Sequence, residues 1–272
     1  AEMIAVGSSV QLAMLLGQKE KELANRTFSV CIKVILGISV IIGLIFFFLS
    51  KPILMLMGTE GMALQYSIEY IRVYAVFSPL IIVYFAADNY LRICGKQNYS
   101  MALNIVTAVL NIVLDFLLLV VWKQGVWAAA FTSCISMALG TVMALCPFFR
   151  NKLELKFVKG WISAKQFVKL VANGSSEFFA NIASSIFSFI LNIVLLSIGG
   201  ATAVAAMSVV MYVESIASMM IFGMSDSMQP AISYCHGAGL KKRVYALEKR
   251  VLVSAAVLSL VACLLLRYGG AW

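Results

Sequence analysis

The sequence of 272 residues has few charged side chains. Only 12% of its residues are charged, whereas 62% are hydrophobic; a soluble domain is roughly half apolar and a quarter charged. So few polar side chains could not cover this much apolar surface in water, which excludes an ordinary soluble domain. The composition therefore predicts an integral membrane protein.

Histidine is nearly absent, and the cysteines form no motif. His236 is the only histidine, and the six cysteines are scattered without a C-x-x-C pair. One histidine cannot build a metal centre, and isolated cysteines in apolar runs indicate neither disulfides nor a bound metal. A membrane enzyme would need a nucleophile beside a base, or a metal cluster, and no such arrangement is present. We therefore expect neither an enzyme nor a cofactor-binding protein.

The strand pattern of a transmembrane barrel, alternating segments of about ten residues, is also absent. Instead, apolar runs of about 20 residues alternate with short polar breaks, which predicts membrane-spanning α-helices. The expected fold class is an all-α, polytopic helical bundle. After the end of a span at 1–16, the predicted spans are 28–50, 68–91, 100–121, 126–148, 168–198, 203–235 and 247–267.

The net charge of +9 follows the predicted topology and does not require a nucleic-acid partner. Fifteen Lys and Arg residues lie in the loops 17–27, 92–99, 149–166 and 236–250, and only three lie in the loops between them. Basic residues gather in cytoplasmic loops, so the first set is predicted to face the cytoplasm. The longest and most basic loop, 149–166, is predicted to link two halves. Binding of anionic lipid headgroups is the other explanation for its charge.

Polar side chains form a stripe along the predicted span 100–121. Asn104, Thr107, Asn111 and Asp115 follow at helical spacing among Val, Leu, Ile and Ala. A carboxylate at mid-bilayer costs roughly 2.5–3.5 kcal/mol, so this face is expected to avoid lipid and line a cavity. Asn111 can hydrogen-bond Asp115 in either protonation state. Burial favours the neutral acid and an amide donor favours the carboxylate, so Asp115 could exchange a proton or serve as one ligand of Na⁺.

A second polar stripe follows in the span 168–198, where Glu177, Asn181 and Asn192 recur at helical spacing. The next span adds Glu214. Interhelical hydrogen bonding is the alternative role for the neutral members of both stripes. The candidate cavity or substrate residues are Asn104, Thr107, Glu177, Asn181, Asn192 and Glu214.

Two further features concern the later spans. Gly223 and Pro230 interrupt the span 203–235, which predicts a bend or a break. A faint internal repeat relates residues 7–22 to residues 227–242, with Gly17 aligned on Gly237. An even number of predicted spans separates the two copies, so both cross the membrane in the same sense, as in a parallel repeat.

Residues 95–136 resemble the signature region of the MATE family, the multidrug and toxic compound extrusion transporters. The matching residues are Gly95, Lys96, Asn111, Asp115, Gly125, Ala128, Ala129 and Ala130. Trp127 stands where the family often has glycine. Residues 227–244 are similar to the Gln-Pro…Gly-Ala…Arg segment after the family's eighth helix, although Cys235-His236 departs from that pattern. Residues 198–206 resemble the loop before that helix.

The resemblance implies two six-helix bundles related by a pseudo-two-fold axis, with a central cavity that opens to one side at a time. It places this chain as an internal piece, from the end of the second helix to the ninth of twelve. Residues 1–148 would then be the first bundle without its first helix, 149–166 a basic cytoplasmic linker, and 167–272 the first three helices of the second bundle. A bacterial family member would lie in the inner membrane.

The resemblance also implies a function: antiport that exports organic, often cationic, compounds in exchange for H⁺ or Na⁺. It assigns Asn111 and Asp115 to the coupling cation, together with an acid on a first helix outside this chain. Glu177 is the candidate for an acid that some members use on their seventh helix. The alternative is a flippase for lipid-linked oligosaccharide from the same superfamily. A flippase would need cations within its spans, whereas Lys33, Arg72 and Lys169 lie near span ends or outside the stripes.

Overall fold

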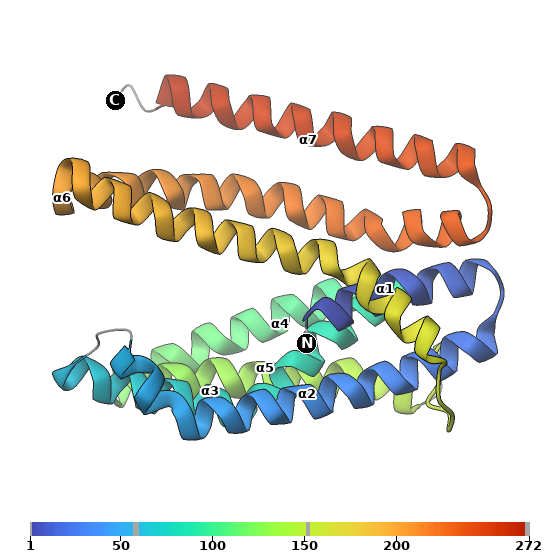
Figure 1. Ribbon diagram of the computed structural model, residues 1–272, viewed down its shortest axis with the longest axis horizontal. Coiled ribbons are helices and arrows are strands. Elements are labelled where there is room, and N and C mark those ends of the chain that lie inside the picture. The colour runs from blue at the N-terminus through green and yellow to red at the C-terminus, as the bar shows by residue number, and fades with distance from the viewer. Residues whose placement is uncertain (1, 57–59, 151–152, 270–272) are drawn as a thin grey trace. The chain divides into compact units, whose positions relative to one another are not determined.

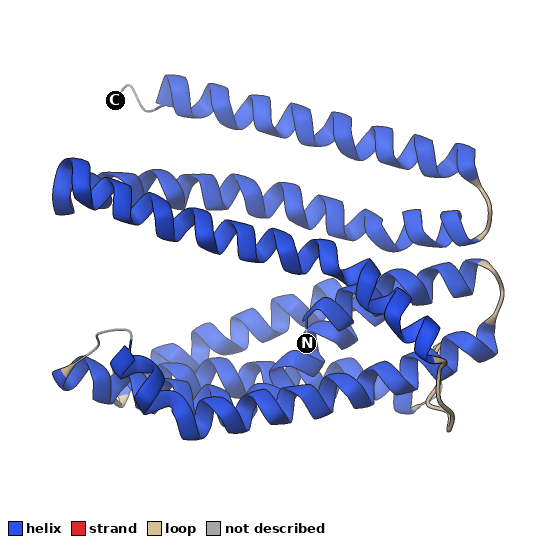
Figure 2. Ribbon diagram, viewed as in Figure 1, coloured by secondary structure: helices blue, strands red, loops and turns tan. Residues whose placement is uncertain are grey.

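The computed structural model describes residues 2–56, 60–150 and 153–269, so Lys152 of the basic loop lies outside the described residues. All regular elements in these ranges are helical (Figure 2). They are α1 (Glu2–Gly17), α2 (Lys21–Leu56), α3 (Gly61–Ile93), α4 (Gln97–Asp115), the π-helix η1 (Phe116–Val121), α5 (Val126–Phe149), α6 (Ala164–Gly237) and α7 (Lys241–Gly269). Each predicted span lies within these helices, which confirms the all-α fold class.

Several of these helices have the properties of membrane spans. Five segments in the described ranges are long and apolar enough to cross a membrane: Lys21–Leu56, Gly61–Ile93, Gln97–Val121, Val126–Phe149 and Ala164–Gly200. Large apolar side chains on their outer faces are exposed, among them Phe48, Ile112 and Val142. An apolar outer face suits contact with lipid and is what the composition predicted.

The chain forms two compact units, which share α1 and α6. The first unit comprises Ala1–Leu12 and Glu20–Gly174, and the second comprises Ala13–Lys19 and Ser175–Trp272. In the first unit, α3 packs against both α2 and α5, and α4 packs mainly against α5 (Figure 1). Small side chains allow these helices to approach closely, since Ala86, Ala87 and Ala130 are fully buried.

Aromatic rings close one end of the first unit. The ring of Phe28 in α2 stacks on Phe148 in α5 with centroids 5.1 Å apart, and meets the edge of Tyr90 in α3 at 5.3 Å. The turn between α3 and α4 lies near the same end. Gly95 follows α3 with φ +72°, a left-handed conformation that favours glycine, and Lys96 N donates to Leu91 O at 3.0 Å. This turn explains the glycine of the Gly-Lys pair in backbone terms.

Helix α6 contains both predicted spans 168–198 and 203–235 as two limbs. They join at Gly200, whose φ of 58° and ψ of −152° are not helical. Gly223 and Pro230 were predicted to bend or break the span; a break is contradicted, because the backbone stays helical at both positions. Reversing the chain needs a positive φ, which Gly200 provides without steric cost. A proline inside an apolar helix removes one hydrogen bond without ending the helix.

Two glycines in the second unit bring α1 and the end of α6 into backbone contact. A Cβ added to Gly17 would overlap the carbonyl oxygen of Tyr234, and a Cβ added to Gly237 would overlap that of Met14. Each glycine therefore meets the residue three positions before the other glycine. This reciprocal contact has the symmetry of the sequence repeat, in which Gly17 aligns with Gly237.

Candidate functional site

The Asp115 carboxyl lies in the first unit, where α4 changes into the π-helix η1. Its side chain is half-buried. Thr132 Oγ1, which is buried on α5, donates a short hydrogen bond to Asp115 Oδ1. π-helical turns are uncommon and frequently occur at functional sites, because the wider turn displaces side chains from regular α-helical positions. The sequence showed the carboxylate but not this change in helix geometry.

Asn111 lies one turn before Asp115 and also faces α5. Its amide nitrogen donates to Ser133 Oγ at 3.3 Å. The sequence suggested that Asn111 would hydrogen-bond Asp115, whereas in the structure two consecutive hydroxyl residues of α5 are the partners of this pair. Residues four apart share a helix face, so both side chains meet the same neighbouring helix. Sequence reasoning missed Thr132 and Ser133, although adjacent hydroxyl residues in an apolar span were visible.

The Asp115 carboxyl accepts a hydrogen bond from the neutral Thr132 hydroxyl. No ion pair involves Asp115 among the residues that the structure describes. A half-buried carboxylate without a basic partner gains most from binding a proton or a small hard cation, since oxygen ligands suit such ions. The arrangement of Asp115, Thr132, Asn111 and Ser133 can therefore hold and release a cation.

The other two members of the α4 stripe have different partners. Asn104 donates from Nδ2 to Asp88 Oδ1 at 3.1 Å and accepts from the Tyr84 hydroxyl at 2.6 Å. Thr107 is buried and donates to Leu103 O within its own helix at 2.9 Å. The structure therefore divides the predicted stripe: Asn104 bonds to α3, whereas Asn111 and Asp115 bond to α5.

Asp88 is the centre of the α3–α4 network. It is only 6% exposed. Arg92 Nη2 donates to Asp88 Oδ2 at 2.7 Å, and Ser100 Oγ makes a short hydrogen bond to Asp88 Oδ1. Asp88 lies near the end of the predicted span 68–91, where water is close, yet its carboxylate is buried. A guanidinium and two neutral donors satisfy it, which gives Asp88 a structural role.

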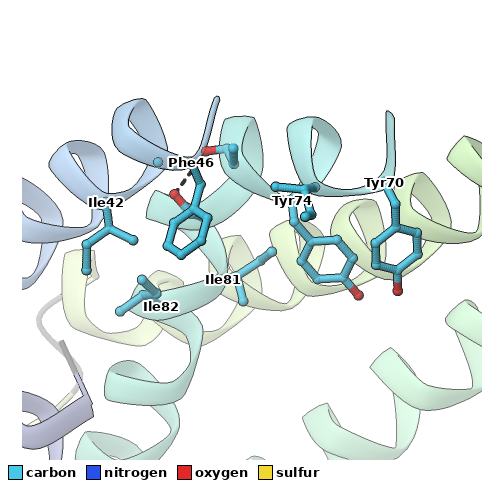
Figure 3. A pocket seen from close by; sticks show the side chains of 10 residues that line it. Ile42, Phe46, Tyr70, Tyr74, Ile81 and Ile82 are labelled. Atoms are coloured by element: carbon cyan, nitrogen blue, oxygen red, sulfur yellow. Dashed lines mark hydrogen bonds between the residues drawn. The ribbon is translucent and has the colours of Figure 1, made fainter. Parts of the chain in front are cut away.

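A groove of about 360 Å³ runs between α2 and α3 in the first unit. Ile42 and Phe46 line one end, and Tyr70 and Tyr74 line the other (Figure 3). The two tyrosine rings stack with centroids 5.1 Å apart, and the Tyr70 phenol lies within electrostatic range of the Asp115 carboxyl. An apolar groove with aromatic walls suits an organic molecule, and a nearby carboxylate adds a preference for positive charge.

The remaining predicted residues, Glu177, Asn181, Asn192 and Glu214, lie on α6 in the second unit and are exposed there. Asn192 lines a small cavity of about 180 Å³ between the two limbs of α6. Neither acid makes an ion pair within the described ranges. Of the predicted site residues, only Asn111 and Asp115 therefore have hydrogen-bond partners that are adjacent to each other on one helix, α5.

Apolar helices of spanning length around a carboxylate without a basic partner define a polytopic membrane protein with a candidate cation site inside a helix bundle. The MatE family model matches residues 2–117 and 178–268. The chain therefore belongs to the MatE family. The matched ranges include α4 with Asn111 and Asp115, as well as α6 from residue 178 onward.

Curated relatives carry the name multidrug export protein MepA. The chain is 25% identical over 238 residues to the protein from Staphylococcus saprophyticus, which covers 85% of this chain and 52% of the relative. It is 25% identical over 260 residues to the protein from Staphylococcus haemolyticus, covering 94% of this chain and 57% of the relative. The chain thus spans about half the length of these relatives.

Solved structures share the fold over almost the entire chain. An outward-facing MATE family multidrug resistance transporter of the MOP superfamily matches with a TM-score of 0.91 at 22% identity, covering 97% of this chain and 59% of that one. The MATE multidrug transporter DinF-BH, solved in complex with a dye, matches with a TM-score of 0.86 at 26% identity, covering 97% and 60%.

Proposed function

We propose that this chain is part of a secondary active antiporter that exports organic, often cationic, compounds from bacterial cells in exchange for H⁺ or Na⁺. Membership of the MatE family, the export function in the names of the staphylococcal relatives and the bound dye of the DinF-BH structure support this proposal. The bacterial plasma membrane is the matching location, because the curated relatives are staphylococcal.

One observation carries the mechanism: two of the carboxylates in the first unit, Asp88 and Asp115, have opposite surroundings. Asp88 is neutralised by Arg92, whereas Asp115 accepts from the Thr132 hydroxyl and takes part in no ion pair among the residues that the structure describes. A carboxylate beside a fixed positive charge gains little from a second cation. Asp115 is therefore the group that takes the coupling ion, with Asn111 as its neighbour, and Asp88 holds the helices together.

The groove between α2 and α3 supplies a site for the exported compound. Tyr70 and Tyr74 offer ring faces to a lipophilic cation, and Ile42, Phe46 and Ile81 provide apolar contacts. A proton or Na⁺ bound at Asp115 removes the negative charge that attracts such a cation. Binding of the coupling ion and binding of the compound are therefore mutually unfavourable, which is the relation that antiport needs.

The flippase alternative has less support from the basic side chains in spans. A pyrophosphate carrier needs cations that face a cavity. Lys33 and Lys169 lie on exposed helix faces, and the Arg72 guanidinium sits 5.6 Å from the Phe47 ring centroid. No lysine or arginine lines the α2–α3 groove of the described first unit.

Replacing Asp115 by asparagine in the full-length protein tests the proposal. We expect Asp115→Asn to abolish coupled efflux while membrane expression stays unchanged, because asparagine keeps the size of the side chain but cannot exchange a proton. Accumulation of a fluorescent cationic dye in cells measures the loss. Asp88→Glu is the matched control, since it keeps the buried charge pair. Dye levels that stay at the wild-type value in Asp115→Asn cells would refute the coupling role.

Liposomes separate the two coupling ions. Purified protein is reconstituted, and dye transport is followed under an imposed H⁺ gradient or an imposed Na⁺ gradient alone. The gradient that drives transport identifies the ion, and Asp115→Asn should abolish the response to it. Transport that neither gradient drives would contradict secondary antiport.

A further inference from the structure

The segment that follows α5 is docked on the first unit and is not a free linker. Leu153 and Leu155 are buried, and the ring of Phe157 lies 4.9 Å from Phe28 and 5.1 Å from Phe149, centroid to centroid. These are alternate residues, so one face of an extended chain meets the aromatic end of the bundle.

Two side chains of α2 hold the backbone of this segment. Asn25 Oδ1 accepts from Lys156 N at 2.8 Å, and Ser29 Oγ accepts from Val158 N at 2.8 Å. Gly160 then passes over the Arg26 side chain, where an added Cβ would lie 3.3 Å from Cγ and Cδ. An unpaired extended chain exposes its amides, and these contacts satisfy two of them. The residues on its outer face therefore have defined positions.

The outer face combines an exposed indole with lysines. Trp161 is 85% exposed. Three lysines within five residues of it in the sequence are also exposed: Lys156, Lys159 and Lys165. A capping box places Lys165 in the first turn of α6, since Ser163 N donates to Gln166 Oε1 at 3.0 Å and Gln166 N donates to Ser163 Oγ at 3.3 Å.

Two acids near this face, Glu154 and Glu22, already have partners. Glu154 pairs with Lys21 at 3.9 Å, and Glu22 pairs with Arg26 at 2.5 Å. By contrast, Lys156, Lys159 and Lys165 take part in no ion pair among the described residues. The face thus keeps a positive charge around one large aromatic side chain.

We propose that residues 156–165 form a binding surface for anionic phospholipid headgroups. The segment lies between two spanning helices, α5 and α6, so the nearest extended anionic surface is the bilayer itself. Tryptophan concentrates at the membrane interface, where its ring is in the headgroup region and its N–H remains polar. Lysines beside it attract anionic lipid within a Debye length of the surface. Docking on α2 fixes this surface before lipid binds, so little ordering entropy is lost.

Fluorescence quenching tests this surface without depending on transport. The full-length protein keeps Trp161, and its other tryptophans are replaced by phenylalanine. It is reconstituted into bilayers of phosphatidylcholine that contain spin-labelled phosphatidylglycerol or spin-labelled phosphatidylcholine. We expect Trp161 to be quenched at lower mole fractions of the anionic lipid. Each lysine that meets a lipid phosphate should contribute about five-fold in relative affinity, and the preference should weaken at high salt.

Two triple variants complete the test. Lys156→Gln/Lys159→Gln/Lys165→Gln should reduce the preference to less than about two-fold, since only weak headgroup contacts remain. The control Lys241→Gln/Lys242→Gln/Lys249→Gln removes the same charge from exposed positions on α7 and should keep it. Equal quenching by both lipids, no quenching by either, or an equal loss in both variants would overturn the proposal. These outcomes do not bear on the coupling ion.

Discussion

Replacing Asp88 by asparagine should destabilise the first unit much more than the same change at Asp115. The Asp88 side chain is 9% exposed and that of Arg92 is 26% exposed. At an effective dielectric of about 20, unit charges about 4 Å apart attract by about 4 kcal/mol. Removing the carboxylate also removes its own desolvation cost, and Arg92 can partly reach solvent. We therefore expect a loss of about 2–3 kcal/mol, below the ~3–5 kcal/mol for a fully buried pair.

A double-mutant cycle isolates the interaction. Asp88→Asn leaves a guanidinium without its partner, and Arg92→Gln leaves a buried carboxylate with only Ser100 and Asn104 as donors. Asp88→Asn/Arg92→Gln removes both charges, so it should cost about 1–2 kcal/mol less than the sum of the single changes. Asp115→Asn is the control, with a cost below ~1 kcal/mol because that side chain is half-buried and uncharged groups surround it.

Reversible unfolding of the purified protein in mixed detergent micelles measures these differences, followed by tyrosine and tryptophan fluorescence. The reasoning would be refuted if Asp88→Asn unfolded at the wild-type detergent fraction. It would also be refuted if the double variant lost the full sum of the two single effects, because the charges would then not interact. Equal destabilisation by Asp88→Asn and Asp115→Asn would remove the distinction between a structural and a coupling acid.

Three further predictions concern contacts described above. Gly237→Ala places a methyl group against a carbonyl of α1 and should lower the free energy of unfolding by about 1–3 kcal/mol. The control Gly223→Ala has nothing within 4 Å of the added Cβ and should not lower it. Equal stabilities of the two variants would contradict the close approach. Thr132→Val removes the hydroxyl that binds Asp115 and should shift the pH profile of transport, and Thr132→Ser should restore it; an unshifted profile in the valine variant would argue against the contact. Burial raises the pKa of the Cys94 thiol to about 11, so its modification by a charged thiosulfonate should rise about ten-fold per pH unit between about pH 7 and 10; a rate that levels off near about pH 8 would contradict this.

The sequence predicted the helical elements well because membrane spans depend on local composition. An uninterrupted apolar run needs no knowledge of its neighbours to form a helix in lipid, since its backbone hydrogen bonds are all internal. The turn within α6 lies at Gly200, in the gap between the predicted spans 168–198 and 203–235, where an open position tolerates a positive φ. The exception is Pro230, a strong helix breaker in sequence terms, where the backbone nevertheless stays helical.

The candidate site was predicted only in part, because its contacts depend on which helix faces which. Periodicity placed Asn104 and Asp115 on one stripe, and the structure directs Asn104 to α3 and Asp115 to α5. The π-helical turn after Asp115 has no clear sequence signature. Thr132 could be found only by knowing that α5 packs against α4. The burial of Asp88 likewise follows from Arg92 and Ser100 closing over it.

The contact between Gly17 and Gly237 restricts how this region can change in evolution. Most packed pairs can exchange volume, so that a larger residue on one side is compensated by a smaller one on the other. Here both partners already have the smallest side chain and each faces main-chain atoms, so neither position has anything to exchange. In an alignment such a pair would give two constant columns and no correlated substitutions. Methods that infer contacts from covariation would therefore miss this close helix crossing in the second unit.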